Sequence, residues 1–553
     1  MIAEKFGRSC LVPFFVLLLG LSLSQAAVRD VTAYGATGNG TNDDTNAINR
    51  AIAELVPGDT LLFPCGTYLT TSQLLISVSG VTIDGSGCAT IHDVGSGISS
   101  VLVIGANGTT MPSYGPAVAL GATAKELATS FTTVSSLGVS PGDYVYIHQG
   151  GLDYSTDTAP GHPTNCDASA CRGEILKVQN VEENVEENQV QTTTALHDTY
   201  DPSVNAAVAQ KMLNPVTGIT VKNITFEGNQ NLLLGFQMNG VVESQVQGVT
   251  ARNVQGAAVY SSGSFNLSYS DITVTQAGSS GCGNAVNLYV AGDMRVYGMS
   301  ISRENPGMGT GCLANGAFGL GVYAVANGRF SRVTVDAAGA YGRPFKTSAA
   351  RWNTFNSVKV KNGATANNGI TLEYYSAHNT FNDCMVTNNG AGTGTGNGNA
   401  GINSFGNFNQ YNTFNNCQVT GNGNIQFYVG SDDALRLGQD SHVTIHGGTF
   451  TGTNDVEPVI LIEGSNASVT GVDIDGQGAA GLWIASSRAC VSNNILTGTF
   501  NSGGIFVSDP ATDIGFGNIL NGNASNLGVG ACSPPMPERV LGDAHGAGER
   551  LTR

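Results

Sequence analysis

The chain has 553 residues, of which 41% are hydrophobic and 12% are charged, and 75 of them are glycine. This hydrophobic share supports a packed core and excludes an intrinsically disordered chain. The formal net charge of −17 argues against nucleic acid and anionic membranes as partners, because such a surface repels both.

Residues 1–26 have the pattern of a secretory signal peptide. Lys5 and Arg8 precede a short apolar run at 11–23, and small residues up to Ala26 suit a cleavage site. The run is too short for a comfortable membrane span, and no later stretch comes close to one. We therefore expect a secreted protein, extracellular or periplasmic, that ends in a disordered tail at 533–553.

Cysteine usage agrees with export. The chain has 11 cysteines, and Cys10 lies within the signal segment, so an even number remains in the mature protein. An even count in an exported chain indicates disulfides, for which we expect pairing in sequence order. No cysteine or histidine cluster has the spacing of a structural zinc site.

The segment from 28 to 91 predicts a capped beginning. A short strand at 31–35 is followed by a turn-rich stretch with Asp43 and Asp44, for which a helix-capping role is favoured over catalysis. The next apolar residues mark one face of an amphipathic helix: Ala47, Ile48, Ala51, Ile52 and Leu55. Strands are predicted at 60–64, 67–69 and 81–85.

Three stretches of this segment, VTAYGATGNGTNDDTNAINRAIAEL, GDTLLFPCGTYL and GVTIDGSG, resemble the opening of the pectate-lyase-like family. That family includes pectin-cleaving, rhamnogalacturonan-cleaving and epimerase-like enzymes and phage tailspikes. The resemblance implies a right-handed parallel β-helix with an N-terminal capping helix. It implies a polysaccharide as partner, but it does not specify the chemistry.

The rest of the chain divides into two patterns. Residues 115–212 contain segments such as 142–147 and 173–178 that read as antiparallel strands, so we predict a β-rich subdomain inserted after a cap and first turns at 27–114. Residues 213–532 repeat. The pattern Asn-Thr-Phe-Asn begins at Asn353, Asn379 and Asn412, with spacings of 26 and 33 residues, which is typical of a solenoid.

Stacked turns should align equivalent residues. We expect an amide ladder through Asn353, Asn379 and Asn412, an internal stack of the phenylalanines two residues later, and either a disulfide or a thiol stack between Cys384 and Cys417. On the strand after each repeat, inward Ile370 and Leu372 would turn Thr371 and Glu373 outward. The outward residues of successive strands should then line an open groove.

This predicted groove concentrates polar and aromatic side chains suited to a sugar chain. Arg343, Lys346, Arg351 and His378 form the one strong basic cluster, which would let an acidic protein hold a uronate carboxylate. The predicted substrate-binding residues are Asn287, Tyr289, Tyr323, Arg351, Tyr374 and His378.

The predicted chemistry is β-elimination from a uronic-acid-containing polysaccharide. The basic cluster would neutralise the carboxylate, and Lys346 would act as the base because neighbouring Arg343 would lower its pKa. Tyr374 or Tyr375 would assist the leaving oxygen. Glu373, with Asp293, would ligate Ca²⁺, the one cofactor that we expect.

Two alternatives remain open. A hydrolase would use paired carboxylates, and Asp432 and Asp433 resemble the paired aspartates of the polygalacturonase family. That family's Asn-Thr-Asp, Gly-His-Gly and Arg-Ile-Lys motifs are missing, and a turn role suits both aspartates equally. The other alternative is a non-catalytic glycan-binding β-helix. The oligomeric state cannot be read from the sequence.

Overall fold

The computed structural model describes most of the chain between Ala26 and Asn521. The described ranges are 26–95, 100–105, 112–149, 172–183, 188–203, 206–229, 234–278, 284–302, 318–337, 343–363, 368–390, 400–405, 409–430, 442–453, 456–464, 466–485, 489–508 and 513–521. The predicted signal peptide, the predicted tail, Asp432 and Asp433 therefore lie outside the described residues, apart from Ala26.

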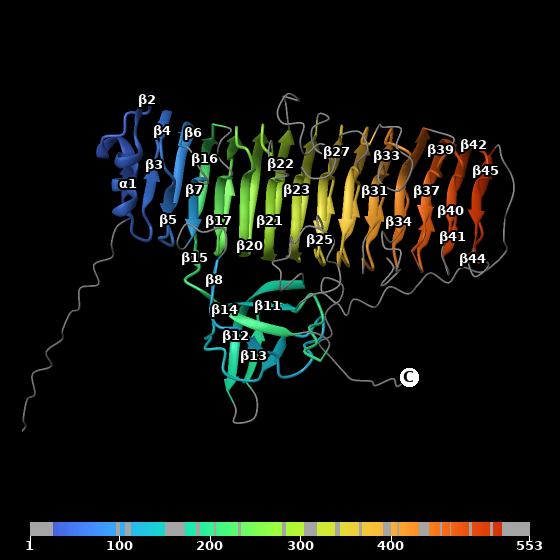
Figure 1. Ribbon diagram of the computed structural model, residues 1–553, viewed down its shortest axis with the longest axis horizontal. Coiled ribbons are helices and arrows are strands. Elements are labelled where there is room, and N and C mark those ends of the chain that lie inside the picture. Colours follow the sequence, from blue (N-terminus) through green and yellow to red (C-terminus); the bar gives the residue numbers. More distant parts are fainter. Residues whose placement is uncertain are drawn as a thin grey trace, which may run out of the picture.

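The protein is a right-handed parallel β-helix, as predicted, with a second, smaller sheet beneath its middle (Figure 1). Most of the strands join one 38-stranded sheet, in which each strand pairs in parallel with the equivalent strand of the next turn. Successive turns therefore lie about 4.8 Å apart. Each full turn contributes strands to three aligned sets, which we call strips A, B and C.

Strip A carries the site considered below. Its strands are β5 (Leu74–Ile76), β7 (Ser100–Gly105), β17 (Leu234–Asn239), the first part of β20 (Ala257–Thr275), β21 (Asn284–Gly292), β23 (Phe318–Ala326), β25 (Arg343–Ser348), β28 (Ile370–Glu373), β31 (Ala400–Phe405), β34 (Ile425–Gly430), β37 (Ile460–Ile462), β40 (Leu482–Ile484) and β43 (Ile505–Val507).

Strip B follows strip A along the chain. Its strands are β1 (Val28–Asp30), β3 (Thr60–Leu62), β15 (Val216–Thr217), β18 (Val241–Gln247), β26 (Thr354–Asn356), β29 (Thr380–Asn382), β32 (Thr413–Asn415), β35 (Thr444–His446), β38 (Ser468–Thr470), β41 (Cys490–Ser492) and β44 (Asp513–Ile514).

Strip C completes each turn. Its strands are β2 (Asn39–Asp43), β4 (Gly66–Thr70), β19 (Thr250–Arg252), β27 (Lys359–Lys361), β30 (Met385–Thr387), β33 (Gln418–Thr420), β36 (Thr449–Thr453), β39 (Asp473–Gly478), β42 (Ile495–Phe500) and β45 (Ile519–Asn521). Four longer strands bend from strip B into strip C: β6 (Thr82–Asp93), β16 (Thr220–Glu227), β22 (Arg295–Ser302) and β24 (Arg329–Asp336).

The N-terminal end of the solenoid carries helix α1 (Thr45–Ala53), which buries Ala47, Ile48 and Ala51, after a short 3₁₀ helix, η1 (Val31–Tyr34). Its apolar face belongs to the same core as the first turns. The Asp43 carboxylate accepts a hydrogen bond from the backbone N–H of Thr45. The two oxygens of Asp44 accept from the backbone N–H groups of the turn before the helix. Asp43 thus satisfies a backbone donor at the helix start, as the capping interpretation predicted, whereas the Asp44 side chain makes no capping hydrogen bond to the helix.

The solenoid core contains the predicted ladders. The Asn353 amide donates to Asn379 Oδ1 at 3.0 Å, and the Asn379 amide donates to Asn412 Oδ1 at 3.0 Å. The phenylalanine two residues after each asparagine stacks on the next turn, with ring centroids 4.5 Å apart for Phe355 and Phe381 and 4.9 Å apart for Phe381 and Phe414. Buried amides that satisfy one another fix the register of the turns.

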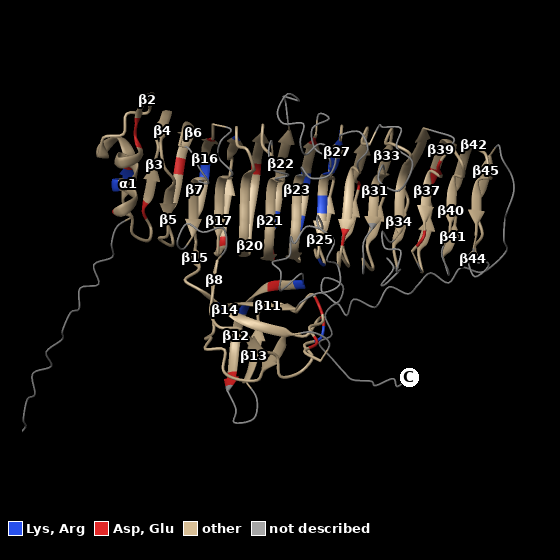
Figure 2. Ribbon diagram, viewed as in Figure 1, with Lys and Arg blue, Asp and Glu red and all other residues tan. Residues whose placement is uncertain are grey.

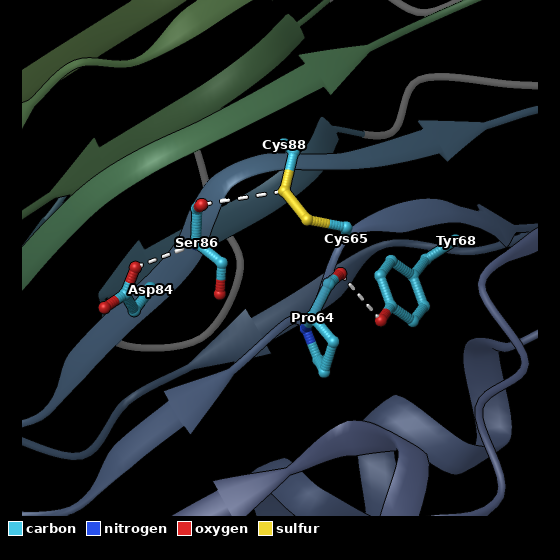
Figure 3. Close-up of a disulfide and its surroundings, with 6 residues drawn as sticks. All are labelled: Pro64, Cys65, Tyr68, Asp84, Ser86 and Cys88. Carbon is cyan, nitrogen blue, oxygen red and sulfur yellow. Dashed lines mark hydrogen bonds between the residues drawn. A yellow bond between two sulfur atoms is a disulfide. The ribbon is translucent and has the colours of Figure 1, made fainter.

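Two disulfides join neighbouring turns and confirm two of the predicted sequential pairs. Cys384 and Cys417 are bonded in the core between repeats. Cys65 and Cys88 are bonded near the capped end, where Cys88 belongs to β6 (Figure 3). Other predicted pairs involve cysteines outside the described residues.

The second sheet has seven antiparallel strands around its own apolar core. Its strands are β8 (Ser113–Tyr114), β9 (Val118–Ala119), β10 (Ser130–Thr133), β11 (Tyr144–Gln149), β12 (Arg172–Glu183), β13 (Asn188–Thr192) and β14 (Ala207–Leu213). It is inserted between β7 and β15, yet β6 pairs with β16 and β7 with β17 as adjacent turns. The solenoid therefore continues across the insertion. No helix in the described part of the chain is long and apolar enough to cross a membrane.

Candidate functional site

The outward residues of strip A align across successive turns. Backbone pairing places Asn287 beside Gly321, Gly321 beside Lys346, Lys346 beside Thr371, and Thr371 beside Asn403. A second column, two residues further along each strand, contains Tyr289, Tyr323, Ser348 and Glu373. The inward positions between them, such as Val322 and Leu372, lie in the core. Strip A therefore has the alternation expected of a strand face.

Three charged side chains converge on this face. Lys346 Nζ lies 2.5 Å from one carboxylate oxygen of Glu373, and Arg343 Nη1 bonds the other oxygen. Lys346 and Arg343 both come from β25, and Glu373 ends β28 on the next turn. Two cations thus share one carboxylate, and β25 is among the few solenoid strands that carry basic residues in Figure 2. We call Arg343, Lys346 and Glu373 the charged triad.

The triad is buried, which corrects the prediction of an open groove at this point. The exposed fraction of the side chain is 1% for Lys346 and 3% for Glu373, whereas it is 22% for Arg343. Thr371, predicted to face solvent, is fully buried as well. Strand alternation establishes which side of the sheet a residue faces, but it does not establish what covers that side. Arg343 is the member of the triad that reaches solvent.

Part of this covering comes from Tyr323. A Cβ atom at Gly321 would lie 2.3 Å from the Tyr323 ring and 2.7 Å from the Asn284 amide, so the space above Gly321 is taken by these two side chains. Asn284 Nδ2 donates to the Tyr323 hydroxyl at 3.2 Å. The Lys346 ammonium lies 5.7 Å from the centroid of the Tyr323 ring, within cation–π range. The glycine thus lets an aromatic ring pack beside the triad.

Two polar atoms beside the triad have no hydrogen-bond partner in the described part of the chain. They are Thr371 Oγ1, one turn after Lys346 in the column, and Asn287 Oδ1, two turns before Lys346. A buried polar atom without a partner costs free energy. Such atoms are suitable acceptors or donors for the hydroxyl groups of a bound sugar.

Toward the C-terminal end of strip A, the column of Lys346 and Asn403 becomes aromatic and apolar. Tyr428 follows Asn403 in register, and then come Leu461, Trp483 and Phe506. The Tyr428 hydroxyl donates to Glu463 Oε2 at 2.7 Å. The sequence pattern did not single out Glu463 or the apolar positions of this column. Their alternation within β37, β40 and β43 is the signal that could have revealed them.

Several predicted site residues lie instead where the second sheet meets the solenoid. Arg351 Nε lies 3.0 Å from Asp198, which also binds Arg172 of β12 in a bidentate pair. The Arg172 guanidinium lies 5.6 Å over the ring of Tyr375. Tyr374 and Tyr375 pack in one apolar cluster with residues of both sheets. The predicted groove-side roles of Arg351, Tyr374 and Tyr375 are therefore wrong, because docking of the second sheet could not be seen in the sequence.

His378 also belongs to this contact. Its ring stacks between Trp352 and Tyr411, with centroids 4.4 Å and 4.7 Å away, and the stack continues to His442. Trp352 Nε1 donates to Glu126 Oε1 of the inserted segment at 2.6 Å, and His378 Nε2 lies 3.5 Å from the same oxygen. Because both ring faces are covered, a substrate-binding role by sugar stacking is excluded for His378.

The electrostatics of this contact follow from burial. Burial, with the nearby Arg351 cation, lowers the pKa of His378 to about 4 and outweighs the Asp198 carboxylate, which favours protonation. Burial would raise the pKa of Asp198, but Arg351 and Arg172 outweigh it and hold that pKa below its ordinary value. At neutral pH, His378 is thus neutral and Asp198 is ionised between two arginines.

The predicted calcium site is not formed by its two residues. Both oxygens of Glu373 are engaged by cations, and Asp293 Oδ1 accepts a hydrogen bond from Asn327. Asp293 and His378 occupy equivalent positions in the solenoid, and the pairing of the following strands places His378 three turns after Asp293. Asp293 is thus about 14 Å along the axis from the turn of Glu373, too far for a shared ion with ligands at about 2.4 Å. Within the described ranges no cluster of three metal-ligating side chains occurs.

Comparison with known proteins supports the resemblance. Residues 28–287 match the family model described as rhamnogalacturonase A/epimerase, pectate lyase-like. This match confirms the resemblance predicted from the opening segment and extends it through the inserted sheet into β21. No curated protein sequence matches the chain.

Solved structures share the fold. The tailspike protein gp49 from Pseudomonas phage LKA1 has 14% sequence identity and a TM-score of 0.56, over 89% of this chain and 81% of that one. The tailspike gp61 of Pseudomonas phage phi297 has 13% identity and a TM-score of 0.54, over 88% of this chain and 83% of that one. At these identities the likeness is one of architecture.

Proposed function

We propose that this protein acts outside the cell on a long polysaccharide and cleaves a uronic-acid-containing chain by β-elimination. The observation that carries the proposal is the convergence of Arg343 and Lys346 on Glu373 at the outward face of strip A. In a chain with a net charge of −17, a local pair of cations gives an acidic polymer a place to bind. The pectate-lyase-like family match and the tailspike fold support a glycan-acting protein.

Arg343 is suited to hold the uronate carboxylate. Its side chain is the exposed member of the triad and carries a guanidinium group with several N–H donors. A planar pair of N–H groups matches a carboxylate in two-point contact. Neutralising the carboxylate makes the proton on the adjacent carbon more acidic, which is the first requirement of β-elimination.

Lys346 and Glu373 are suited to move protons. The Lys346 ammonium can pass a proton to Glu373 across their 2.5 Å contact, and this exchange removes two buried charges. The neutral amine then takes the proton from the carbon beside the carboxylate, and the electron pair forms a double bond as the bond to the next glycosidic oxygen breaks. The proton held by Glu373 balances the step when it reaches the leaving oxygen.

An extracellular site of action agrees with the disulfides. Disulfides such as Cys384–Cys417 persist in oxidising compartments, and residues 1–26 were predicted as an export signal. The polymer would lie along strip A and reach the triad at Arg343, its exposed member. Tyr323 is buried beside Lys346, and Tyr289 packs against the cluster that joins the second sheet to the solenoid, so neither ring is assigned to the sugar chain.

Non-catalytic glycan binding is the second candidate function, and the burial of Lys346 favours it. A fully buried ammonium already in contact with Glu373 must be uncovered before it can reach a substrate. For hydrolysis, Glu373 and Glu463 are the carboxylates of the second outward column, and they lie three turns apart, about 14 Å. Retaining and inverting enzymes need their carboxyl groups within about 10 Å. The predicted pair Asp432 and Asp433 lies outside the described residues.

A panel of glycans distinguishes these functions. Full-length protein would be incubated with polygalacturonate, alginate, hyaluronate, gellan and neutral glucans, and products would be followed by the ultraviolet absorbance of unsaturated ends and by reducing sugar. We expect both signals with at least one uronate polymer. Reducing ends without unsaturation would replace the lyase by a hydrolase, and retained binding without either product would leave a binding protein.

A further inference from the structure

Beyond the triad, the outward face of strip A carries an aromatic surface near its C-terminal end. Trp483 and Phe506 are neighbours in register on β40 and β43, half-buried, with ring centroids 4.9 Å apart and planes at 72°. Leu461 precedes them in the same column, and Trp483 packs against its apolar cluster. We call Leu461, Trp483 and Phe506 the aromatic platform.

We propose that the aromatic platform is a second sugar-binding subsite, which takes a neutral sugar of the same polymer that the triad holds by a uronate. The inference rests on the proposed function and adds to it the sugar composition of the bound polymer. The polymer should carry uronate at one position and uncharged sugar several units away. A pure polyuronate would not satisfy both ends of the surface.

Continuity with the triad identifies the occupant of the platform. The column runs in unbroken register from Lys346 through Thr371, Asn403, Tyr428 and Leu461 to Trp483. Five steps of about 4.8 Å separate Lys346 from Trp483, roughly 24 Å along the axis. Thr371, Asn403 and Tyr428 are 0–2% exposed, so an extended polymer that reaches both places would pass over this buried part of the column, whereas a compact ligand could not span the distance.

Charge selects the sugar at the platform. Glu463 lies at the end of β37, one turn before the strand of Trp483, and it holds the Tyr428 hydroxyl at 2.7 Å. A carboxylate at this position repels a second carboxylate on the ligand. The platform itself offers apolar ring surface, on which the C–H face of an uncharged sugar can rest. The cationic end and the neutral end of the surface thus favour different sugars.

The Trp483 ring is held in place. Its indole Nε1 donates to the Ser508 hydroxyl at 3.0 Å, at the exposed edge of the strip. An aromatic side chain whose polar atom is already satisfied loses little conformational entropy when a ligand covers it. Such rings commonly dominate the affinity of a binding surface.

The chain contains only two tryptophans, which gives a direct test. In a Trp352→Phe protein, Trp483 is the sole tryptophan, so fluorescence reports on the platform alone. We expect gellan oligosaccharides, in which glucuronate is separated by neutral sugars, to shield Trp483 from acrylamide. Trp483→Ala in the otherwise natural chain should weaken gellan binding about tenfold.

Phe516→Ala is the matched control, because Phe516 is a 74% exposed aromatic residue outside strip A, and it should bind gellan like the natural protein. Thermal melting would establish that each variant is folded, and shielding of the native Trp483 does not depend on the alanine variant. Equal gellan binding by Trp483→Ala and no shielding would overturn the subsite while leaving the proposed function intact. A natural protein that binds no glycan of the panel would overturn both.

Discussion

Lys346 and Glu373 meet diagonally across two turns of the solenoid. In backbone register Lys346 pairs with Thr371 and Glu373 pairs with Ser348, yet the ammonium and the carboxylate are 2.5 Å apart. A long lysine side chain spans the diagonal distance between strand neighbours. The contact therefore depends on the register of β25 and β28, and it places a proton donor beside a proton acceptor on the face proposed to bind glycan.

Replacing Lys346 tests its proposed role as a base. We expect Lys346→Met to lower the rate of unsaturated-product formation by about 100-fold or more, because a thioether cannot take a proton. Binding should persist, since Arg343 remains. Lys359→Met is the matched control, because Lys359 is exposed on strip C. A Lys346→Met protein with natural turnover would remove the base assignment.

Replacing Glu373 tests the triad as a structural unit. Glu373→Gln keeps the shape but leaves two cations without a carboxylate, and we expect unfolding free energy in urea to fall by roughly 3–5 kcal/mol. Adding Lys346→Met should recover part of this loss, because one buried charge is then removed as well. If the two changes were simply additive in a double-mutant cycle, the 2.5 Å contact would carry no coupling.

The lowered pKa of His378 predicts that the stability of the protein depends on pH. An unfolded histidine binds a proton near pH 6.5, whereas burial lowers the pKa of folded His378 to about 4. Between these values the unfolded chain binds more protons, so stability falls as the pH decreases, by up to roughly 3 kcal/mol.

The change His378→Phe should keep the stack on Trp352 and flatten this slope in urea unfolding from neutral pH to about pH 4. His446→Gln, at an exposed position on strip B, should retain the slope of the natural protein. The explanation fails if the His378→Phe protein loses stability over this range as steeply as the natural protein.

The Cys384–Cys417 disulfide should contribute to stability through the unfolded state. It closes a loop of 33 residues, for which loop entropy predicts roughly 3–4 kcal/mol. A double Cys→Ala variant should unfold at correspondingly lower urea concentration and respond less to reductant than the natural protein. Unchanged unfolding in the variant would show that the amide and phenylalanine ladders alone hold these turns.

The repeats were predictable because each turn repeats the same local chemistry. Asn379, Phe381 and Cys384 recur at fixed offsets, and a period of about one turn allows only a stack in which like residues meet. The amide ladder, the ring stack and the Cys384–Cys417 disulfide could therefore be predicted from the repeat. The convergence of Lys346 and Glu373 also followed from strand alternation and aligned turns.

The parts that failed depend on contacts between distant segments. Asp198 and Glu126 belong to the inserted segment, and no local pattern shows that they meet Arg351 and Trp352. Once that docking is formed, Tyr375 and His378 are covered. The prediction that Lys346 lines an open groove was wrong for a related reason. Strand alternation gives the direction of a side chain but not what packs above it.

The pairing of the solenoid turns on the two sides of the inserted sheet has a consequence for folding kinetics. The Thr217 N–H donates to Ser79 Oγ, 138 residues away, whereas later turns are joined by bonds such as Asn353 to Asn379, only 26 residues apart. Closing a longer loop costs more chain entropy and delays contact formation. The solenoid should therefore nucleate on the C-terminal side of the insertion. The capped N-terminal turns would then join last, onto a template of turns that already exists.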